Sequence, residues 1–167
     1  RFETGLMGRW HGAWISDGND KNHRAAPYFR KTFDAAKSIK SARAYISAGG
    51  LFVLSVNGQR VGDHFLDPVY TRYDRRCSYV TFDITPLLHS GRNALGVVLG
   101  TGWYNHQALA VWDFDRAPWR NRPTFCMDVV VTYTDGTKVE AESTDDEILK
   151  WGCTFSDDLK EAYPDAK

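Results

Sequence analysis

Short runs in which apolar and polar residues alternate recur along the chain and predict an antiparallel β-structure. Residues 51–56 alternate in this way, Asn57-Gly58 follows directly, and the next apolar position is Val61. An Asn-Gly pair between two such runs is the strongest short-range signal for a hairpin. We therefore expect a β-hairpin that turns at Asn57 and Gly58.

The same pattern predicts the other strands, and eight or so strands with almost no helix indicate an all-β fold. Residues 94–99 are almost wholly apolar, which predicts burial on both faces of that strand. Thr85 at a cap position and Pro86 behind it predict one helical turn within 85–90. The expected fold is an antiparallel β-sandwich or jelly roll with one or two short helical turns. The further strands are expected at 10–15, 28–33, 41–48, 78–84, 124–133, 138–142 and 145–151.

Two long connections interrupt this pattern, at 62–76 and at 103–123. The first is polar and contains Pro68, which excludes a central strand. Loops of this length in a compact domain often carry function, so both connections are the places to look for a site. The predicted organisation is a lead-in at 1–9, a sandwich domain at 10–155 and an exit linker at 156–167.

Composition excludes some classes of partner. The 167 residues suffice for one domain with a real core. The 21 basic and 21 acidic residues balance, which argues against nucleic acid or an anionic membrane surface as partner. No apolar run is long enough to span a bilayer. The chain begins at Arg1 without an initiator Met, which suggests a processed chain or an excised domain.

The three cysteines, Cys77, Cys126 and Cys153, match no zinc-binding spacing. We expect buried, inert thiols that act as small hydrophobic groups. A Cys126–Cys153 disulfide is the alternative if the protein is exported.

Ordered motifs run through most of the chain and resemble one known family. They read FETGL at 2–6, WHGAWI at 10–15, PYFRKTF at 27–33, VNGQRVGD at 56–63 and GRNALGVVLGTGWY at 91–104. Together they resemble the N-terminal β-sandwich domain of bacterial α-L-rhamnosidases. The chain departs from the family at 68–71, where PVYT stands in place of the frequent PGWT.

The resemblance implies a galactose-binding-like jelly roll that is one module of a longer enzyme. In that family a separate helical barrel hydrolyses terminal L-rhamnose with inversion, which requires two carboxylates roughly 6.5–9.5 Å apart. No such pair is recognisable in this sequence. We therefore expect a non-catalytic accessory module whose partners are the catalytic and β-domains of its parent chain. The resemblance also favours a periplasmic or extracellular location.

The resemblance further implies that L-rhamnose is bound with the help of a calcium ion. Oxygen ligands suit calcium, and the candidates are Asp63, Asn57 and Asn105. Two of them have an alternative, purely structural explanation, because Asn57 and Asp63 also suit the turns in which they lie. The candidate contacts for the sugar are Asp63, His64, Asp67, Tyr70, Tyr73, Tyr104, Asn105 and Trp112.

Three tryptophans in the second long connection need separate treatment, because aromatic faces bind sugars as well as filling cores. Trp103 directly continues an apolar strand, and we expect it to complete the core. Trp112 and Trp119 lie among charged residues, and we expect them to be exposed or to face a neighbouring domain.

Two roles compete for such a module. An exposed apolar patch would favour a structural module that packs on the catalytic barrel. A polar, concave loop end with clustered carboxylates would favour a module that binds L-rhamnose-containing glycans. Two hypotheses from other classes are a free-standing lectin-like module and an autonomous glycosidase, which would need two acids with perturbed acidity in one cleft.

Overall fold

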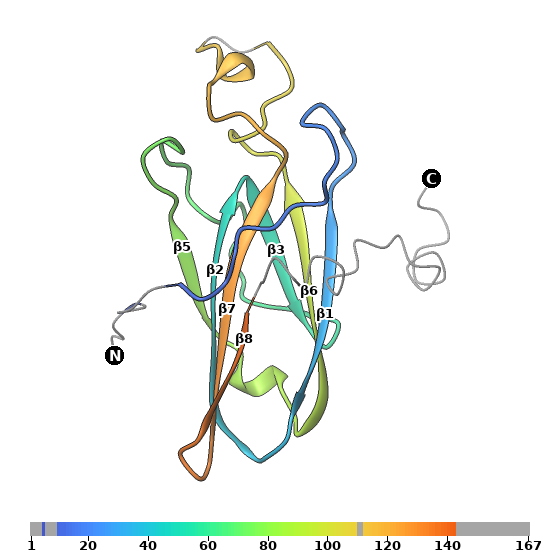
Figure 1. The fold of residues 1–167 in the computed structure, drawn as a ribbon, viewed down its shortest axis with the longest axis vertical. Helices are drawn as coiled ribbons and strands as arrows, with labels where there is room; N and C mark the ends of the chain where they lie inside the picture. The colour runs from blue at the N-terminus through green and yellow to red at the C-terminus, as the bar shows by residue number, and fades with distance from the viewer. Residues whose placement is uncertain (1–4, 6–9, 110–111, 143–167) are drawn as a thin grey trace.

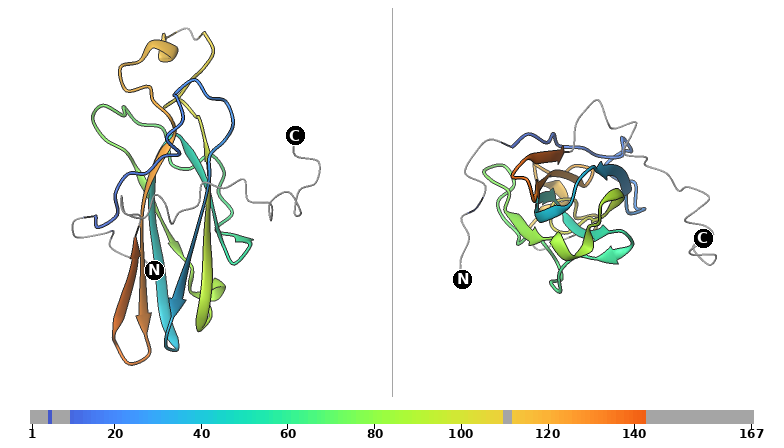
Figure 2. Two further views of the ribbon diagram at one scale, coloured as in Figure 1. Left: turned by 45° about the vertical axis from the view of Figure 1, so that its right-hand side comes forward. Right: turned by 90° about the horizontal axis from the view of Figure 1, so that it is seen from below.

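The computed structural model describes residues 5, 10–109 and 112–142, which form two four-stranded antiparallel sheets packed face to face (Figures 1 and 2). The first sheet has the order β1 (Tyr28–Ala35), β6 (Gly91–Gly100), β3 (Leu51–Val56) and β4 (Gln59–Arg60). The second has the order β5 (Tyr79–Asp83), β2 (Ile39–Gly49), β7 (Thr124–Tyr133) and β8 (Lys138–Glu142). The predicted all-β sandwich is confirmed.

The core lies between the two sheets and is built by alternate residues of each strand, as the period of two requires. On β7 the core face carries Phe125, Met127 and Val129, all fully buried. Rings from opposite sheets meet there, since the centroids of Phe29 and Phe125 are 5.0 Å apart. Each such side chain contributes about 1.5–3 kcal/mol to stability on burial. The one continuous core makes the described region a single domain.

The predicted hairpin joins β3 to β4. Asn57 has φ 51° and Gly58 has φ 79°, and Val56 pairs with Gln59 across the turn. Positive φ at both central residues is what a two-residue hairpin turn demands. The connection from Gly62 to Arg76 contains no strand, as predicted, and touches the first sheet through one bridge between Phe52 and Asp67.

Two strand predictions need correction. β6 is buried on its core face only, because its other face carries small, half-buried residues such as Ala94 and Gly96. Residues 10–15 form no strand, and only Ile15 makes a bridge, to Phe125. This N-terminal segment crosses the outer face of β7 instead (Figure 1), where the backbone N–H groups of His11 and Gly12 donate to the Asp128 side chain and only Ile15 pairs with the strand. The strand expected at 145–151 and the linker at 156–167 lie outside the described residues.

Two 3₁₀ turns, η1 (Thr85–Leu87) and η2 (Phe114–Arg116), are the helical elements of the described region. The predicted cap at Thr85 is wrong, because η1 starts after Ile84 and has no side-chain cap bond. The Thr85 hydroxyl instead accepts the N–H of Ala42 (2.9 Å) and so ties η1 to β2. Among the described residues no helix has the length and apolarity needed to cross a membrane.

Candidate functional site

The two long loops meet at one end of the sandwich, at the top of Figure 1. Leu51 opens β3 and pairs with Gly100, which closes β6, so the loop after β6 starts at this end. The other loop is held here by the Phe52 N–H, which donates to the Asp67 carbonyl (2.8 Å). The topology therefore brings residues 62–78 and 101–123 together, which their separation in sequence does not predict.

Aromatic rings join these two loops into a loop-end aromatic cluster. Tyr73 and Tyr104 have centroids 5.1 Å apart, and Phe114 lies 5.9 Å from Tyr70 and 5.1 Å from Trp103. Phe114 is the centre of the cluster and was not among the residues predicted from sequence. Its only sequence signal is that it lies in the aromatic-rich second loop. Trp112 and Trp119 also contact Phe114, at 6.0 and 6.4 Å.

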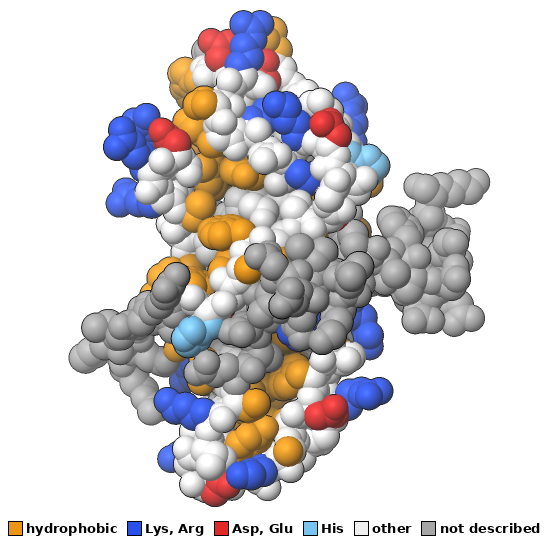
Figure 3. Space-filling view, viewed as in Figure 1, with side chains coloured by type: hydrophobic (Ala, Val, Ile, Leu, Met, Phe, Trp, Pro, Cys, Tyr) orange, Lys and Arg blue, Asp and Glu red, His pale blue; other side chains and the backbone are white. Residues whose placement is uncertain are grey.

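A groove of about 440 Å³ opens beside this cluster, and it is mainly apolar. Hydrophobic side chains appear among the loops at this end of the molecule in the space-filling view (Figure 3). The residues that line the groove are Leu51, Leu66, Pro68, Val69, Tyr70, Tyr73, Gly102, Trp103 and His106. Among the residues that the structure describes, none that lines this groove carries a carboxylate.

The tryptophans correct two predictions. Trp103 does not complete the core but is 42% exposed, because the chain turns at Gly102 (φ 49°) directly after β6. It stacks on His106 with a centroid distance of 5.2 Å. Trp119 is half-buried rather than exposed, whereas Trp112 is 73% exposed, as predicted.

Two of the three tyrosines of the cluster have raised pKa values. Burial raises the pKa of Tyr73 to about 12, and burial also raises the pKa of Tyr104. Both phenols therefore stay neutral at physiological pH. They can offer hydrogen bonds and ring faces, and they are poorly suited to accept a proton from a substrate.

Three of the predicted polar residues lie together on the loop after β4. His64 Nδ1 is 3.2 Å from Asp67 Oδ2, and His64 Nε2 is 3.7 Å from Asp63 Oδ1. The Asp63 side chain is 99% exposed. This carboxylate is thus free to meet a ligand.

Asn57 and Asn105 do not lie together. Asn57 follows β3, while Asn105 lies beyond Gly100, whose strand partner is the first residue of β3. The length of β3, roughly 16 Å at about 3.3 Å per residue, separates the two ends. Calcium ligands lie about 2.3–2.6 Å from the ion, so Asn57 and Asn105 cannot hold the same calcium.

The amides of these two residues also differ in their partners. Asn57 Oδ1 accepts the Ala94 N–H (2.8 Å), and its Nδ2 donates to the Leu87 carbonyl (2.8 Å) and to Asn93 Oδ1 (2.9 Å). Asn105 is buried and donates to the Lys21 carbonyl, while its Oδ1 has no hydrogen-bond partner in the structure. The predicted three-residue calcium set therefore does not form one site, and the described part of the chain has no group of three or more His, Cys, Asp or Glu placed to hold a metal.

The cysteines fit the expectation of inert thiols in part. Cys126 is buried, whereas Cys77 is only half-buried. Burial raises the pKa of the Cys77 thiol, which lowers its thiolate fraction and its reactivity. Cys153, and with it the alternative disulfide, lies outside the described residues.

Comparisons with known proteins connect this sandwich to one family. The family described as the α-L-rhamnosidase N-terminal domain matches residues 37–159. An α-L-rhamnosidase of Formosa agariphila is 39% identical over 130 residues, which is 75% of this chain and 13% of that protein. This chain therefore spans only a small part of the length of the relatives it matches.

Solved structures of α-L-rhamnosidases are similar to this chain in both fold and sequence. The α-L-rhamnosidase of Aspergillus terreus superposes with a TM-score of 0.71 at 37% identity, over 80% of this chain and 16% of that one. The Streptomyces avermitilis α-L-rhamnosidase, solved in complex with L-rhamnose, gives a TM-score of 0.61 at 34% identity, over 71% of this chain and 11% of that one. The chain belongs to the α-L-rhamnosidase N-terminal domain family.

Proposed function

We propose that this domain is a non-catalytic accessory module of an α-L-rhamnosidase, which packs through its loop end against the catalytic barrel of the parent chain. The observation that carries the proposal is the apolar groove at the loop end. Leu66 and Val69 are 75% and 67% exposed, and Tyr70 and Trp103 are each more than two-fifths exposed. Exposed apolar patches with aromatic anchors are typical of interaction surfaces.

The choice of a neighbouring domain as the occupant rests on the length of the relatives. Because the matched region is 13% of the Formosa protein, most of such an enzyme lies outside this domain. Domains of one chain commonly pack on each other through interfaces that resemble transient protein interfaces.

A binding experiment in trans tests this proposal. The purified domain is titrated calorimetrically into the parent enzyme from which the domain has been deleted. Binding is expected, and Trp103→Ser and Leu66→Ser should each weaken it at least about tenfold, since central apolar anchors contribute most of such binding energy. Val53→Ser is the matched control, because Val53 on β3 is 43% exposed but is not among the residues that line the groove. Equal affinities for all four proteins would contradict the proposal.

A second candidate function, binding of L-rhamnose with calcium, is favoured by the rings in the groove and by the exposed Asp63. Tyr70 and Trp103 offer ring faces for sugar C–H groups. The Streptomyces relative, solved with L-rhamnose, makes this sugar the natural ligand to test. Titration with L-rhamnose, in calcium and in chelator, should then give calcium-dependent heat that is lost in Asp63→Ala. Asp34→Ala, an exposed aspartate on β1, should bind like wild type. No heat up to tens of millimolar sugar would exclude this second function.

A further inference from the structure

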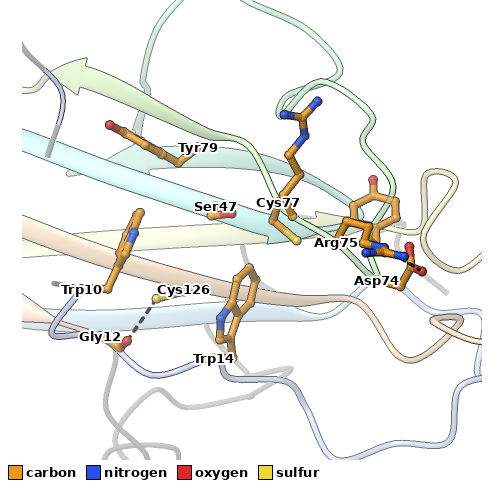
Figure 4. A pocket seen from close by; sticks show the side chains of 11 residues that line it. Trp10, Gly12, Trp14, Ser47, Asp74, Arg75, Cys77, Tyr79 and Cys126 are labelled. Carbon is orange, nitrogen blue, oxygen red and sulfur yellow. Dashed lines mark hydrogen bonds and ion pairs between the residues drawn. The ribbon is translucent and has the colours of Figure 1, made fainter.

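A second pocket, of about 460 Å³, lies on the outer face of the second sheet and shares only Tyr73 with the lining of the groove (Figure 4). Its walls come from the N-terminal segment and from the end of the loop that leads into β5. The volume falls within the usual range of small-ligand sites. Asp63, Asn57 and Asn105 do not line this pocket.

Four aromatic side chains line the pocket, and Tyr73 from the loop before β5 is one of them. Trp10 and Trp14 stand on the N-terminal segment, and Tyr79 faces them from β5 (Figure 4). Trp10 and Tyr79 meet edge to face with centroids 5.6 Å apart. Trp14 is 46% exposed and Tyr79 39% exposed although both line a cavity. Large ring faces left open inside a concave site are suited to stack on a flat, partly apolar ligand.

The floor of the pocket is polar and fixed. Ser47 on β2 is buried, and its hydroxyl donates to the Ser78 carbonyl (2.8 Å). A hydroxyl that donates once still has lone pairs that can accept a hydrogen bond from a ligand. The backbone of the N-terminal segment is held over β7 by Asp128, which accepts the N–H of Gly12 at 2.7 Å. The walls and floor therefore keep their places without a ligand.

The rim carries an excess of positive charge. Asp74 is the acidic residue of the lining, and Arg72 already pairs with it through two contacts of 2.8 and 3.0 Å. Arg75 Nε lies 4.0 Å from the same carboxylate, at the limit of an ion pair. Arg76 forms no ion pair within the part of the chain that the structure describes. Arg76 thus remains available for an anionic ligand, and Arg75 is held only by a contact at the limit of an ion pair.

We propose that this pocket binds a pyranose that carries a carboxylate, such as a uronic acid residue of an acidic polysaccharide. The C–H face of the sugar ring would stack on Trp14 and Tyr79, and its carboxylate would pair with Arg75 or Arg76. Arginine is well matched to a carboxylate, because its planar guanidinium donates two parallel hydrogen bonds. Trp14, Tyr79, Arg75 and Arg76 do not line the groove, so the assignment does not depend on whether the groove binds a domain or L-rhamnose.

Titration with methyl glucuronide tests the assignment, with methyl glucoside as the uncharged control. Tryptophan fluorescence is the readout, because two tryptophans line the pocket. Saturable binding of the glucuronide at about millimolar concentration is expected, with glucoside binding at least about tenfold weaker. No binding of the glucuronide up to tens of millimolar would overturn the proposal. Equal binding of benzoate would overturn the sugar as ligand, since stacking and charge would then suffice.

Variants of the lining residues test where methyl glucuronide binds. Trp14→Ala should abolish it, and Arg75→Gln combined with Arg76→Gln should weaken it about tenfold while leaving the fold intact, because both arginines are exposed. Arg92→Gln, an exposed arginine on β6, and Trp103→Ala in the groove should leave it unchanged. Loss of binding in Trp103→Ala with retention in the arginine variant would place the ligand in the groove and overturn the assignment.

Discussion

Arg122 and Asp17 form a buried ion pair that joins the loop after Ile15 to the start of β7. Arg122 Nε is 2.8 Å from Asp17 Oδ1, and the two side chains are only 4% and 3% exposed. The same guanidinium donates to the carbonyls of His23 and Ala25, at 2.7 Å each. One side chain therefore fixes the whole loop that leads into β1.

Replacing Arg122 by Met should lower the free energy of unfolding by about 3–5 kcal/mol, because the Asp17 carboxylate would stay buried without its partner. Urea unfolding followed by circular dichroism measures this. The control is Arg72→Met, which breaks the exposed pair with Asp74 and should cost no more than about 1 kcal/mol. Similar costs for the two variants would contradict the role assigned to Arg122.

The pair also predicts a dependence of stability on pH. Burial alone would raise the pKa of Asp17, but hydrogen bonds from Arg122 and Asn19 outweigh it and lower the pKa to about 2 from an ordinary value of 3.8. A carboxyl with a lowered pKa stabilises the fold fully above its unfolded value. That stabilisation, about 2 kcal/mol, is lost as the pH falls from about 4 to about 2.

Unfolding free energies of wild type and Asp17→Asn, measured from pH 6 down to the lowest pH at which both are folded, check this. The wild-type value should fall more steeply than that of the variant below pH 4, because the variant lacks the titrating carboxyl. Parallel curves would show that Asp17 does not carry the effect.

Local chemistry explains which parts of the fold the sequence predicts. The turn at Asn57 and Gly58 is specified by the two residues themselves, and most strands follow from alternation. The segment 10–15 was mistaken for a strand because the group that binds it, Asp128, lies 116 residues from Gly12 in sequence. Contacts of this kind join residues that are far apart in sequence, so local patterns do not predict them.

The residues of the candidate site also divide into those that local sequence places together and those that only the topology places. Asp63, His64 and Asp67 are close because they are neighbours in one loop. Asn57 and Asn105 were grouped because both suit calcium, but strand pairing places them at opposite ends of β3. Only the topology brings Phe114 to the centre of the loop-end aromatic cluster.

The Asn57 amide should stabilise the fold apart from its role in the turn. Asn57→Gly keeps a residue that accepts positive φ but removes the bonds to Leu87, Asn93 and Ala94. We expect a loss of about 1–3 kcal/mol, since buried groups of the protein lose their partners. Chemical unfolding measures it.

Gly58→Ala complements that variant. The added Cβ would meet no other atom, but an alanine at φ 79° is strained, and the amide network of Asn57 is left intact. The free energy of unfolding should therefore fall by about 1–2 kcal/mol through the backbone alone. A neutral Asn57→Gly alongside a costly Gly58→Ala would show that the turn conformation, and not the amide, stabilises this corner.

The last prediction concerns the Asp128 carboxylate, which holds the N-terminal segment on β7. Its two oxygens accept the N–H groups of His11 (3.1 Å) and Gly12 (2.7 Å). Asp128→Ala removes both acceptors and should speed amide hydrogen exchange at these two positions, at a cost of about 1–3 kcal/mol. Asp128→Asn keeps one acceptor oxygen, so it should protect one of the two amides and cost less. Because Trp10 and Trp14 stand on the same segment, the alanine variant should also lose the binding of methyl glucuronide. Unchanged exchange at His11 and Gly12 in Asp128→Ala would show that the side chains of the segment, rather than this carboxylate, keep it in place.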